Sequence, residues 1–123
     1  MENLIIEETK YTPLIKMDTN GTIELVGKSY PENTFEFYVP MMEWVKEYFE
    51  TSAADVTTVN MEITYFNSSS SKLFFDFFDL LEENNDKKIV INWIYDEENE
   101  SALEAGEDFM EDFEDLTINL VEK

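Results

Sequence analysis

Four consecutive serines at positions 68–71 are the residues of this sequence that could most readily do chemistry. They follow a β-type run that ends near Phe66, and apolar residues at helical spacing come directly after them, so we expect them where a strand leads into a helix. Serine and asparagine side chains at such a junction can cap the free N–H groups of the first helical turn. A serine hydroxyl there can also accept a phosphoryl group, whose negative charge is stabilised beside a helix N-terminus. The pattern is compatible with both roles together.

Two further segments combine residues suited to helix capping or to contact with a partner. Asp96, Asn99 and Glu100 follow an apolar strand-like run and open the next helical stretch. The run Tyr30-Pro31-Glu32-Asn33 stands before another helix, where proline and asparagine are common. Loops that follow the strands of an α/β sheet lie at one edge, so we expect the Asp96 and Ser68 segments to be neighbours. Capping and partner contact both stay open for these segments.

The sequence lacks the residues that several kinds of catalytic site and metal site require. The sequence has no Cys and no His, which excludes thiolate nucleophiles, histidine bases and the usual zinc sites. The carboxylates between Glu97 and Asp115 lack the spacing and the glycine of a calcium loop, and they indicate a solvated helix face. A carboxylate-based hydrolase would need a substrate cleft that a chain of this size seldom provides. We therefore expect no enzyme, no metal site and no cofactor.

The charge balance narrows the choice of partners. Asp and Glu number 29 against 8 Lys and Arg, which gives a formal net charge of −21. Nucleic acids and anionic membranes are recognised through clusters of basic residues, so neither is an expected partner. No stretch has the basic flank and apolar centre of a leader or the length of a membrane span, and a cytoplasmic location is the expectation. An apolar fraction of 43% predicts a folded core, and residues 1–123 are expected to form one domain.

The hydrophobic pattern predicts an α/β fold with a mixed sheet. Asn20-Gly21 separates two β-type runs and predicts an antiparallel hairpin with a tight turn in which both residues take positive φ. Strands then alternate with helices, which predicts crossover connections and parallel pairing in the later part of the sheet. The expected strands are 4–8, 12–17, 22–26, 59–66, 88–95 and 116–121, and the expected helices are 33–49, 73–81 and 97–113.

Three details of these elements are also predicted. Pro40 should kink the first helix, or leave an irregular first turn before a shorter helix. The nearly continuous apolar run 88–95 is typical of a central strand covered on both faces. The third helix should turn its large apolar residues inward, namely Leu103, Phe109, Met110 and Phe113.

Four segments together give the sequence a likeness to a known family: Ser29-Tyr30-Pro31-Glu32-Asn33, Tyr65-Phe66-Asn67-Ser68-Ser69-Ser70, Asp79-Leu80-Leu81-Glu82-Glu83 and Trp93-Ile94-Tyr95-Asp96-Glu97-Glu98-Asn99-Glu100. In their order and spacing the sequence resembles the SiaC family of bacterial regulatory phosphoproteins over most of its length. That family has a fold similar to STAS domains and to anti-sigma-factor antagonists. The resemblance therefore implies a STAS-like domain with an N-terminal hairpin and about three helices.

The resemblance also implies a partner-switching regulator. Members of the family have a phosphorylated Ser or Thr just after the strand, at the position of Ser68 here, and Ser69 and Ser70 are alternative acceptors. The implied partners are a serine/threonine kinase, a PP2C-like phosphatase, and a diguanylate cyclase that the unphosphorylated form binds and activates. Control of c-di-GMP and of biofilm formation and aggregation would follow. The residues expected to contact partners are Tyr30, Pro31, Glu32, Asn33, Tyr65, Asn67, Asp96, Asn99 and Glu100.

Other functions stay open beside this one. A constitutive acidic scaffold or interaction domain would use the charged surface without any phosphorylation switch. A hydrolase acting through paired carboxylates is a third and more distant hypothesis. A phosphoryl group confined to residues 68–71 would favour the switch over the scaffold.

Overall fold

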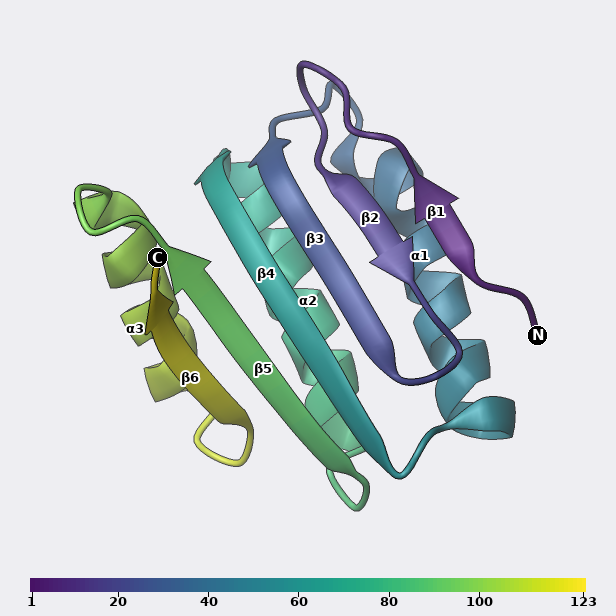
Figure 1. Ribbon diagram of the computed structural model, residues 1–123. Helices are drawn as coiled ribbons and strands as arrows, with labels where there is room; N and C mark the ends of the chain where they lie inside the picture. The colour runs from purple at the N-terminus through teal and green to yellow at the C-terminus, as the bar shows by residue number, and fades with distance from the viewer.

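The computed structural model of the protein contains one six-stranded sheet with the strand order β1-β2-β3-β4-β5-β6 (Figure 1). It describes residues 1–123 apart from the side chain of Ser52. The first three strands pair antiparallel, and β3 to β6 pair parallel, which confirms the predicted mixed sheet with an N-terminal antiparallel part. The strands are β1 (Leu4–Ile6), β2 (Leu14–Met17), β3 (Thr22–Ser29), β4 (Val56–Phe66), β5 (Lys88–Tyr95) and β6 (Thr117–Glu122).

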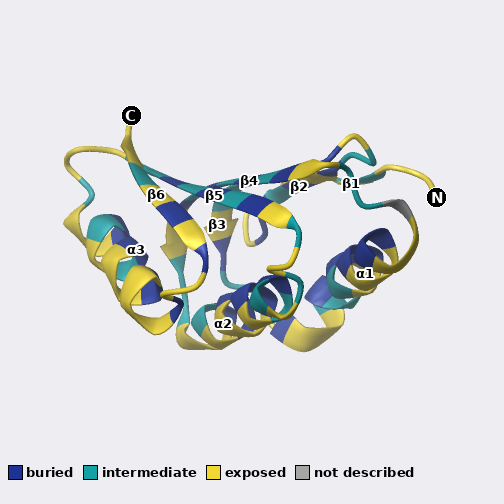
Figure 2. Cartoon of the chain, turned by 90° about the horizontal axis from the view of Figure 1, so that it is seen from below, coloured by how far each residue is buried: buried dark blue, intermediate teal, exposed yellow. Residues whose placement is uncertain are grey.

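Three α-helices cover one face of this sheet and leave the other face open, as Figure 2 shows. Each helix connects two neighbouring parallel strands. Crossovers of one hand that step across a sheet in one direction all place their helices on the same side. The helices are α1 (Thr34–Glu47), α2 (Ser68–Glu83) and α3 (Glu100–Asp112), and a short π-helical turn, η1 (Tyr48–Ser52), continues α1.

Helix α2 lies at the centre of the core and presents to the sheet the apolar stripe that its spacing predicted. Phe74, Phe77 and Phe78 are fully buried. The Phe74 ring lies 5.9 Å from the ring of Tyr38 on α1, and the Phe78 ring lies 4.8 Å from that of Phe109 on α3, both edge to face. Aromatic contacts on both sides therefore hold α2, and with it the serine turn, in place.

The open face contradicts the prediction that residues 88–95 form a strand covered on both sides. Side chains that alternate along β5 are buried beneath the helices, but Val90 and Ile94 are only half-buried on the open face. A row of amides crosses this face, with Asn92 donating to Asn60 at 2.8 Å and Asn119 donating to Asn92 at 3.2 Å. The apolar run was misleading because β-branched residues also suit half-exposed strand positions.

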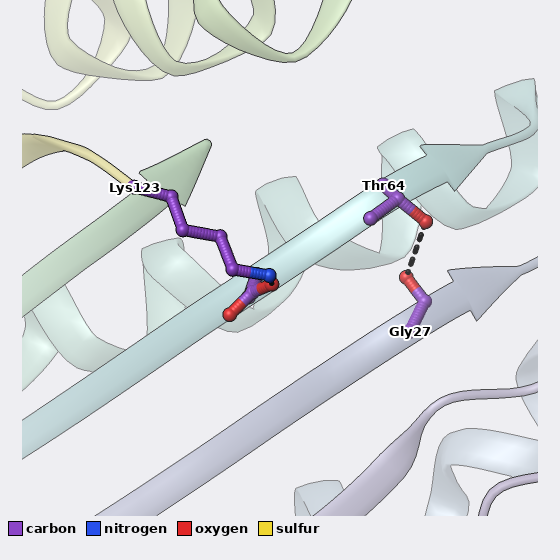
Figure 3. Close-up of polar contacts among 4 residues, drawn as sticks. Gly27, Thr64 and Lys123 are labelled. Atoms are coloured by element: carbon purple, nitrogen blue, oxygen red, sulfur yellow. Dashed lines mark hydrogen bonds and ion pairs between the residues drawn. The ribbon is translucent and has the colours of Figure 1, made fainter. Parts of the chain in front are cut away.

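Polar contacts beyond this row link further strands of the open face (Figure 3). Lys123 donates from Nζ to Glu62 at 2.7 Å, and this hydrogen bond raises the pKa of the Lys123 ammonium. Thr64 donates to the carbonyl oxygen of Gly27 at 3.4 Å, next to a β-bulge between β3 and β4. The face exposed to solvent thus satisfies much of its polarity within the sheet.

The predicted hairpin joins β2 to β3, but its turn is longer than a two-residue turn. Asp18 donates its N–H to the Thr22 carbonyl at 2.9 Å, and Gly21 donates to the Asp18 carbonyl at 3.0 Å. Gly21 has φ 105°, whereas no non-glycine residue among those described has a positive φ, so Asn20 does not adopt the predicted conformation. A two-residue turn of the predicted type needs a positive φ at both residues. This longer turn needs a positive φ only at its last residue, which is Gly21.

Helix α1 continues through Pro40, so the shorter helix is not formed. The proline removes the N–H that would bond to the carbonyl of Glu36. Both residues are exposed, and water can satisfy that carbonyl. The predicted start of the helix is confirmed, because the Asn33 side chain accepts the N–H of Glu36 at 3.0 Å as an N-cap.

Helix α3 packs on the sheet through small residues that the sequence analysis overlooked. Ala102 and Gly106 are buried, whereas Met110, which was predicted to face the core, is 38% exposed. The reason is Trp93 of β5, whose indole Nε1 donates to the Ala102 carbonyl at 2.8 Å. A Cβ atom on Gly106 would lie 2.6 Å from Cδ1 of this indole. The bulky ring therefore requires small residues on the facing helix.

This packing predicts an unusual effect of a helix-favouring substitution. Replacing glycine by alanine within a helix ordinarily stabilises it by about 0.5–1 kcal/mol. Gly106→Ala should instead lower the free energy of unfolding by about 1–3 kcal/mol, because the new methyl group would overlap Trp93 and a methyl of Leu120 at 2.7 Å. Urea denaturation measures the change, and the exposed neighbour Glu107→Ala serves as control, with an expected change within about 0.5 kcal/mol. A more stable Gly106→Ala variant would contradict this packing.

Candidate functional site

The loops that follow β3, β4 and β5 lie at the carboxyl edge of the sheet, because parallel strands end at the same side (Figure 1). Asn67, just after β4, donates its N–H to the carbonyl of Ser29 at the end of β3, at 3.1 Å. Asn99, after β5, donates its side-chain amide to the carbonyl of Thr64 in β4, at 3.0 Å. The structure thus brings the Ser68 and Asp96 segments to one edge, as predicted.

The first turn of α2 places two serine hydroxyls in solvent. Asn67 is the N-cap, with φ −86° and ψ 177°, and its side-chain oxygen accepts the N–H of Ser70 at 2.9 Å. Capping therefore falls to Asn67, and Ser68 and Ser69 are exposed as the first residues of the helix. The first N–H groups of a helix have no acceptor within it. The Ser68 hydroxyl thus lies at the positive end of the α2 dipole.

Ser70 has a different environment from its neighbours. Its side chain is fully buried, and its hydroxyl donates to the carbonyl oxygen of Ser29 at 3.0 Å. The Ser70 and Ser29 hydroxyl oxygens lie 2.7 Å apart, and the Ser29 hydroxyl lies 2.6 Å from that of Tyr38. The Ser70 hydroxyl has one proton and donates it to the Ser29 carbonyl. The Ser29 hydroxyl must therefore donate to the Ser70 oxygen, and the Tyr38 hydroxyl must donate to the Ser29 oxygen.

This chain of hydroxyls corrects one of the sequence-based choices. Ser70 was named as an alternative phosphate acceptor, but a hydroxyl buried and hydrogen-bonded on both sides is out of reach of a kinase in the folded protein. Burial raises the pKa of Tyr38 well above its usual value, against the opposing effect of its hydrogen bond to Ser29, so the donor at the head of the chain stays protonated. Ser70 is an anchor of the turn. Sequence spacing gave no sign of its partners, because Ser29 and Tyr38 lie far from it along the chain.

Tyrosine rings cluster at the same edge. The ring of Tyr30 lies 5.6 Å from that of Tyr65 and 5.3 Å from that of Tyr11, both edge to face. Tyr65 and Tyr11 are 55% and 52% exposed. Tyr30 and Tyr65 were predicted contact residues, and the structure brings them together. Tyr11 was missed because a lone aromatic residue in an irregular segment gives no periodic signal.

The remaining predicted contact residues divide between structural hydrogen bonds and surface. Asn33 caps α1, and Asn99 caps α3 by accepting the N–H of Ala102 at 3.1 Å. Asp96 accepts the N–H of Glu98 at 2.9 Å and shapes the turn before that helix. The exposed members of the set are Glu32, Asn33, Asp96 and Glu100, and Pro31 is half-buried.

Two grooves flank α2 and both reach the serine turn. Lys72 contributes to both, and its ammonium lies 3.5 Å from the carboxylate of Asp76. The α2–α3 groove has a volume of 410 Å³, and its lining includes Phe66, Ser68, Phe75, Asp108, Phe109 and Asp112. The α1–α2 groove has a volume of 450 Å³, and its lining includes Glu32, Asn33, Phe35, Ser69, Leu73 and Asp76. Ser68 therefore belongs to the α3 side of α2 and Ser69 to the α1 side.

The carboxyl edge thus presents an exposed serine hydroxyl at a helix N-terminus and a cluster of tyrosine rings. Among the side chains that the structure describes, no three carboxylates converge as a metal site would require. None of the described helices has the length and apolar character needed to cross a bilayer. The fold and the edge define a small single-sheet α/β module with a serine turn at its carboxyl edge.

Comparison with known proteins assigns the family within this class. The model of the SiaC family of regulatory phosphoproteins matches residues 6–123. A protein of Pseudomonas aeruginosa (strain UCBPP-PA14) is 34% identical over 115 residues, which cover 91% of this chain and 90% of that protein. The chain belongs to the SiaC family, and the resemblance drawn from its sequence is confirmed.

Solved structures agree with the family assignment. SiaC of Pseudomonas aeruginosa is 30% identical with a TM-score of 0.85, and the match covers 98% of this chain and 97% of that one. The crystal structure of the diguanylate cyclase SiaD in complex with its activator SiaC, from Pseudomonas aeruginosa, contains a chain that is 31% identical with a TM-score of 0.90. That match covers 98% of this chain and 99% of that one.

The buried hydroxyl chain predicts a sharp contrast between two adjacent serines. Ser70→Ala leaves the Ser29 hydroxyl without its acceptor inside the core and should lower the free energy of unfolding by about 1–3 kcal/mol. Ser69→Ala changes an exposed side chain in the same turn and should have an effect within about 0.5 kcal/mol. Urea denaturation of the two variants measures the difference. Equal stabilities of the two variants would show that the buried hydrogen bonds among Ser70, Ser29 and Tyr38 contribute nothing to the free energy of unfolding.

The raised pKa of Tyr38 predicts a loss of stability in alkali. Because the folded protein holds this proton more tightly than the unfolded chain, whose tyrosines titrate near 10.0, the stabilisation is complete below that pH and is lost as pH rises above it. The free energy of unfolding should therefore fall more steeply with pH in the wild type than in Tyr38→Phe over the range from about pH 9.5 to about pH 11, which spans the ordinary tyrosine pKa. Urea denaturation at each pH measures it. Parallel curves would contradict the assignment.

Proposed function

We propose that the protein is a phosphorylation-switched binding regulator and that Ser68 is its phosphate acceptor. The observation that supports this most is the exposure of the Ser68 hydroxyl at the first position of α2, on the carboxyl edge of the sheet, in a chain that belongs to a family of regulatory phosphoproteins. Ser69 is the alternative acceptor, since it is exposed in the same turn.

The electrostatics of the turn favour a phosphate at this position. A phosphoryl group carries close to two negative charges at neutral pH and is stabilised by the first N–H groups of a helix. Asn67 occupies only the N–H of Ser70 with its side chain, which leaves the earlier N–H groups of the turn for the phosphate. Lys72 stands one helical turn after Ser68, where a phosphate could draw it from Asp76. Modification would thus change the charge of the edge without unfolding it.

The partners of such a switch follow from the family. We propose a serine/threonine kinase and a PP2C-like phosphatase as the enzymes that add and remove the phosphate. The solved complex of SiaC with the cyclase SiaD, which it activates, supports a diguanylate cyclase as the effector of the unphosphorylated form. The protein would then act in the cytoplasm on c-di-GMP levels, and so on biofilm formation and aggregation, without being an enzyme itself.

Mass spectrometry tests this function directly. The purified protein is incubated with lysate of its native host and ATP, and its phosphopeptides are then mapped. The expected result is one phosphoryl group on Ser68 of the wild type. The Ser68→Ala variant should lack it, and the Ser70→Ala variant, incubated in the same way, should still have it. An unmodified chain throughout, in a lysate that phosphorylates other proteins, would favour a constitutive acidic scaffold, for which the net charge of −21 is the main support.

A further inference from the structure

We propose that the α2–α3 groove is the docking site for a basic amphipathic helix of a partner protein, which inserts one large apolar side chain between α2 and α3 and sets two basic side chains against Asp108 and Asp112. This inference rests on the proposed function, because it names the surface and the chemistry by which an effector would be recognised. It adds a contact surface that lies beside the phosphate acceptor.

The floor of the groove is aromatic and partly uncovered. Phe66, Phe75 and Phe109 contribute to its lining. Phe75 is 42% exposed, although its ring lies 4.8 Å from the buried ring of Phe113. A large apolar side chain left this open at the edge of a core gains free energy when a partner covers it. The groove therefore favours an apolar anchor.

One wall of the groove is formed by carboxylates of α3 that repel one another and so destabilise this helix. Asp108 and Asp112 are exposed and four residues apart, so they face the groove one above the other. Glu104 and Asp108 repeat the same spacing, and like charges at this spacing destabilise a helix. The last turn of α3 has no basic residue, although a helix C-terminus favours positive charge. Cationic side chains of a partner would relieve this repulsion.

The spacing of the two aspartates indicates the geometry of the partner. Side chains four residues apart on one helix are matched by two basic side chains four residues apart on another helix that lies along it. Arginine suits such contacts because its guanidinium binds a carboxylate through two parallel hydrogen bonds. An apolar residue on the same face of that helix would reach the aromatic floor. A helix-in-groove mode therefore fits both features.

The position of Ser68 connects this surface to the switch. Ser68 lines the same groove, so a phosphate on it would stand on the rim beside the incoming helix. A phosphate next to an apolar interface must give up water when the interface closes, which opposes docking, whereas its negative charge attracts the arginines of the helix. Ser69 lines the α1–α2 groove instead, so a phosphate there would leave the α2–α3 groove largely unchanged. The choice of serine would thus decide which groove is affected.

A model peptide and a pair of charge-matched variants test the proposal. The probe is an 18-residue fluorescent peptide with leucines on one helical face and arginines four residues apart beside it, and its binding to the full chain is followed by anisotropy in about 0.15 M salt. Asp108→Lys/Asp112→Lys should weaken binding about tenfold or more. Glu107→Lys/Glu111→Lys makes the same charge change at the same spacing on the same helix but outside the groove lining, and should weaken binding less than about threefold.

The apolar anchor has its own variants. Phe75→Ser should weaken binding of the peptide about tenfold, whereas Phe35→Ser, which removes a 74% exposed ring on α1 outside this groove, should leave it unchanged. Circular dichroism establishes that each variant is folded. Equal weakening by both lysine pairs, or no binding of the peptide by the wild type at about 1 mM, would overturn the proposal. Because the assay uses neither ATP nor a kinase, that outcome leaves the phosphorylation of Ser68 as a separate question.

Discussion

The orientation of the first turn of α2 is the constraint on which the rest of this site depends. Ser70 is held inside by its hydrogen bonds to the hydroxyl and carbonyl of Ser29 at the end of β3. Successive residues of a helix are rotated by about 100°, so an inward Ser70 forces Ser68 to the outer side. Phe74 and Phe77, on the inner side of the same helix, are fully buried and fix the same rotation. The exposure of Ser68 therefore follows from the packing of the whole helix.

The arrangement of helices on one face divides the protein into two surfaces with different chemistry. On the open face of the sheet, Glu62 is paired with Lys123 and the asparagines bond to one another across the strands. On the helical side, α3 has carboxylates in every turn and grooves beside α2 reach the serine turn. A phosphate at that turn would change the charge of both the helical side and the carboxyl edge.

The sequence predicted the parts of this fold that depend on regular spacing. The alternating strands, the apolar stripe of α2, the parallel later sheet and the capping role of Asn33 all come from local patterns, and all are present in the structure. The family was predicted from short segments in a characteristic order, and comparison confirms it. The strand-to-helix junction at the serines was also predicted, although α2 begins at Ser68 and not at Leu73.

The features that were missed depend on contacts between distant residues. Nothing in a run of four serines tells which one turns inward, because that is decided by Ser29 and Tyr38 on other elements. The small residues of α3 were overlooked because their role is set by the indole of Trp93 on β5. The open face of β5 was misjudged since local pattern does not reveal how many layers cover a sheet.

The most direct test of this account places phosphoserine itself at single positions of the turn by genetic encoding and measures the free energy of unfolding of each protein. With phosphoserine at Ser68 the account predicts a stability within about 1 kcal/mol of the unmodified chain, because the dianion remains in solvent at a helix N-terminus. With phosphoserine at Ser70 it predicts a loss of at least about 3 kcal/mol, since a charge would be forced into the core. Equal losses at the two positions would contradict the orientation of the turn and the switch that depends on it.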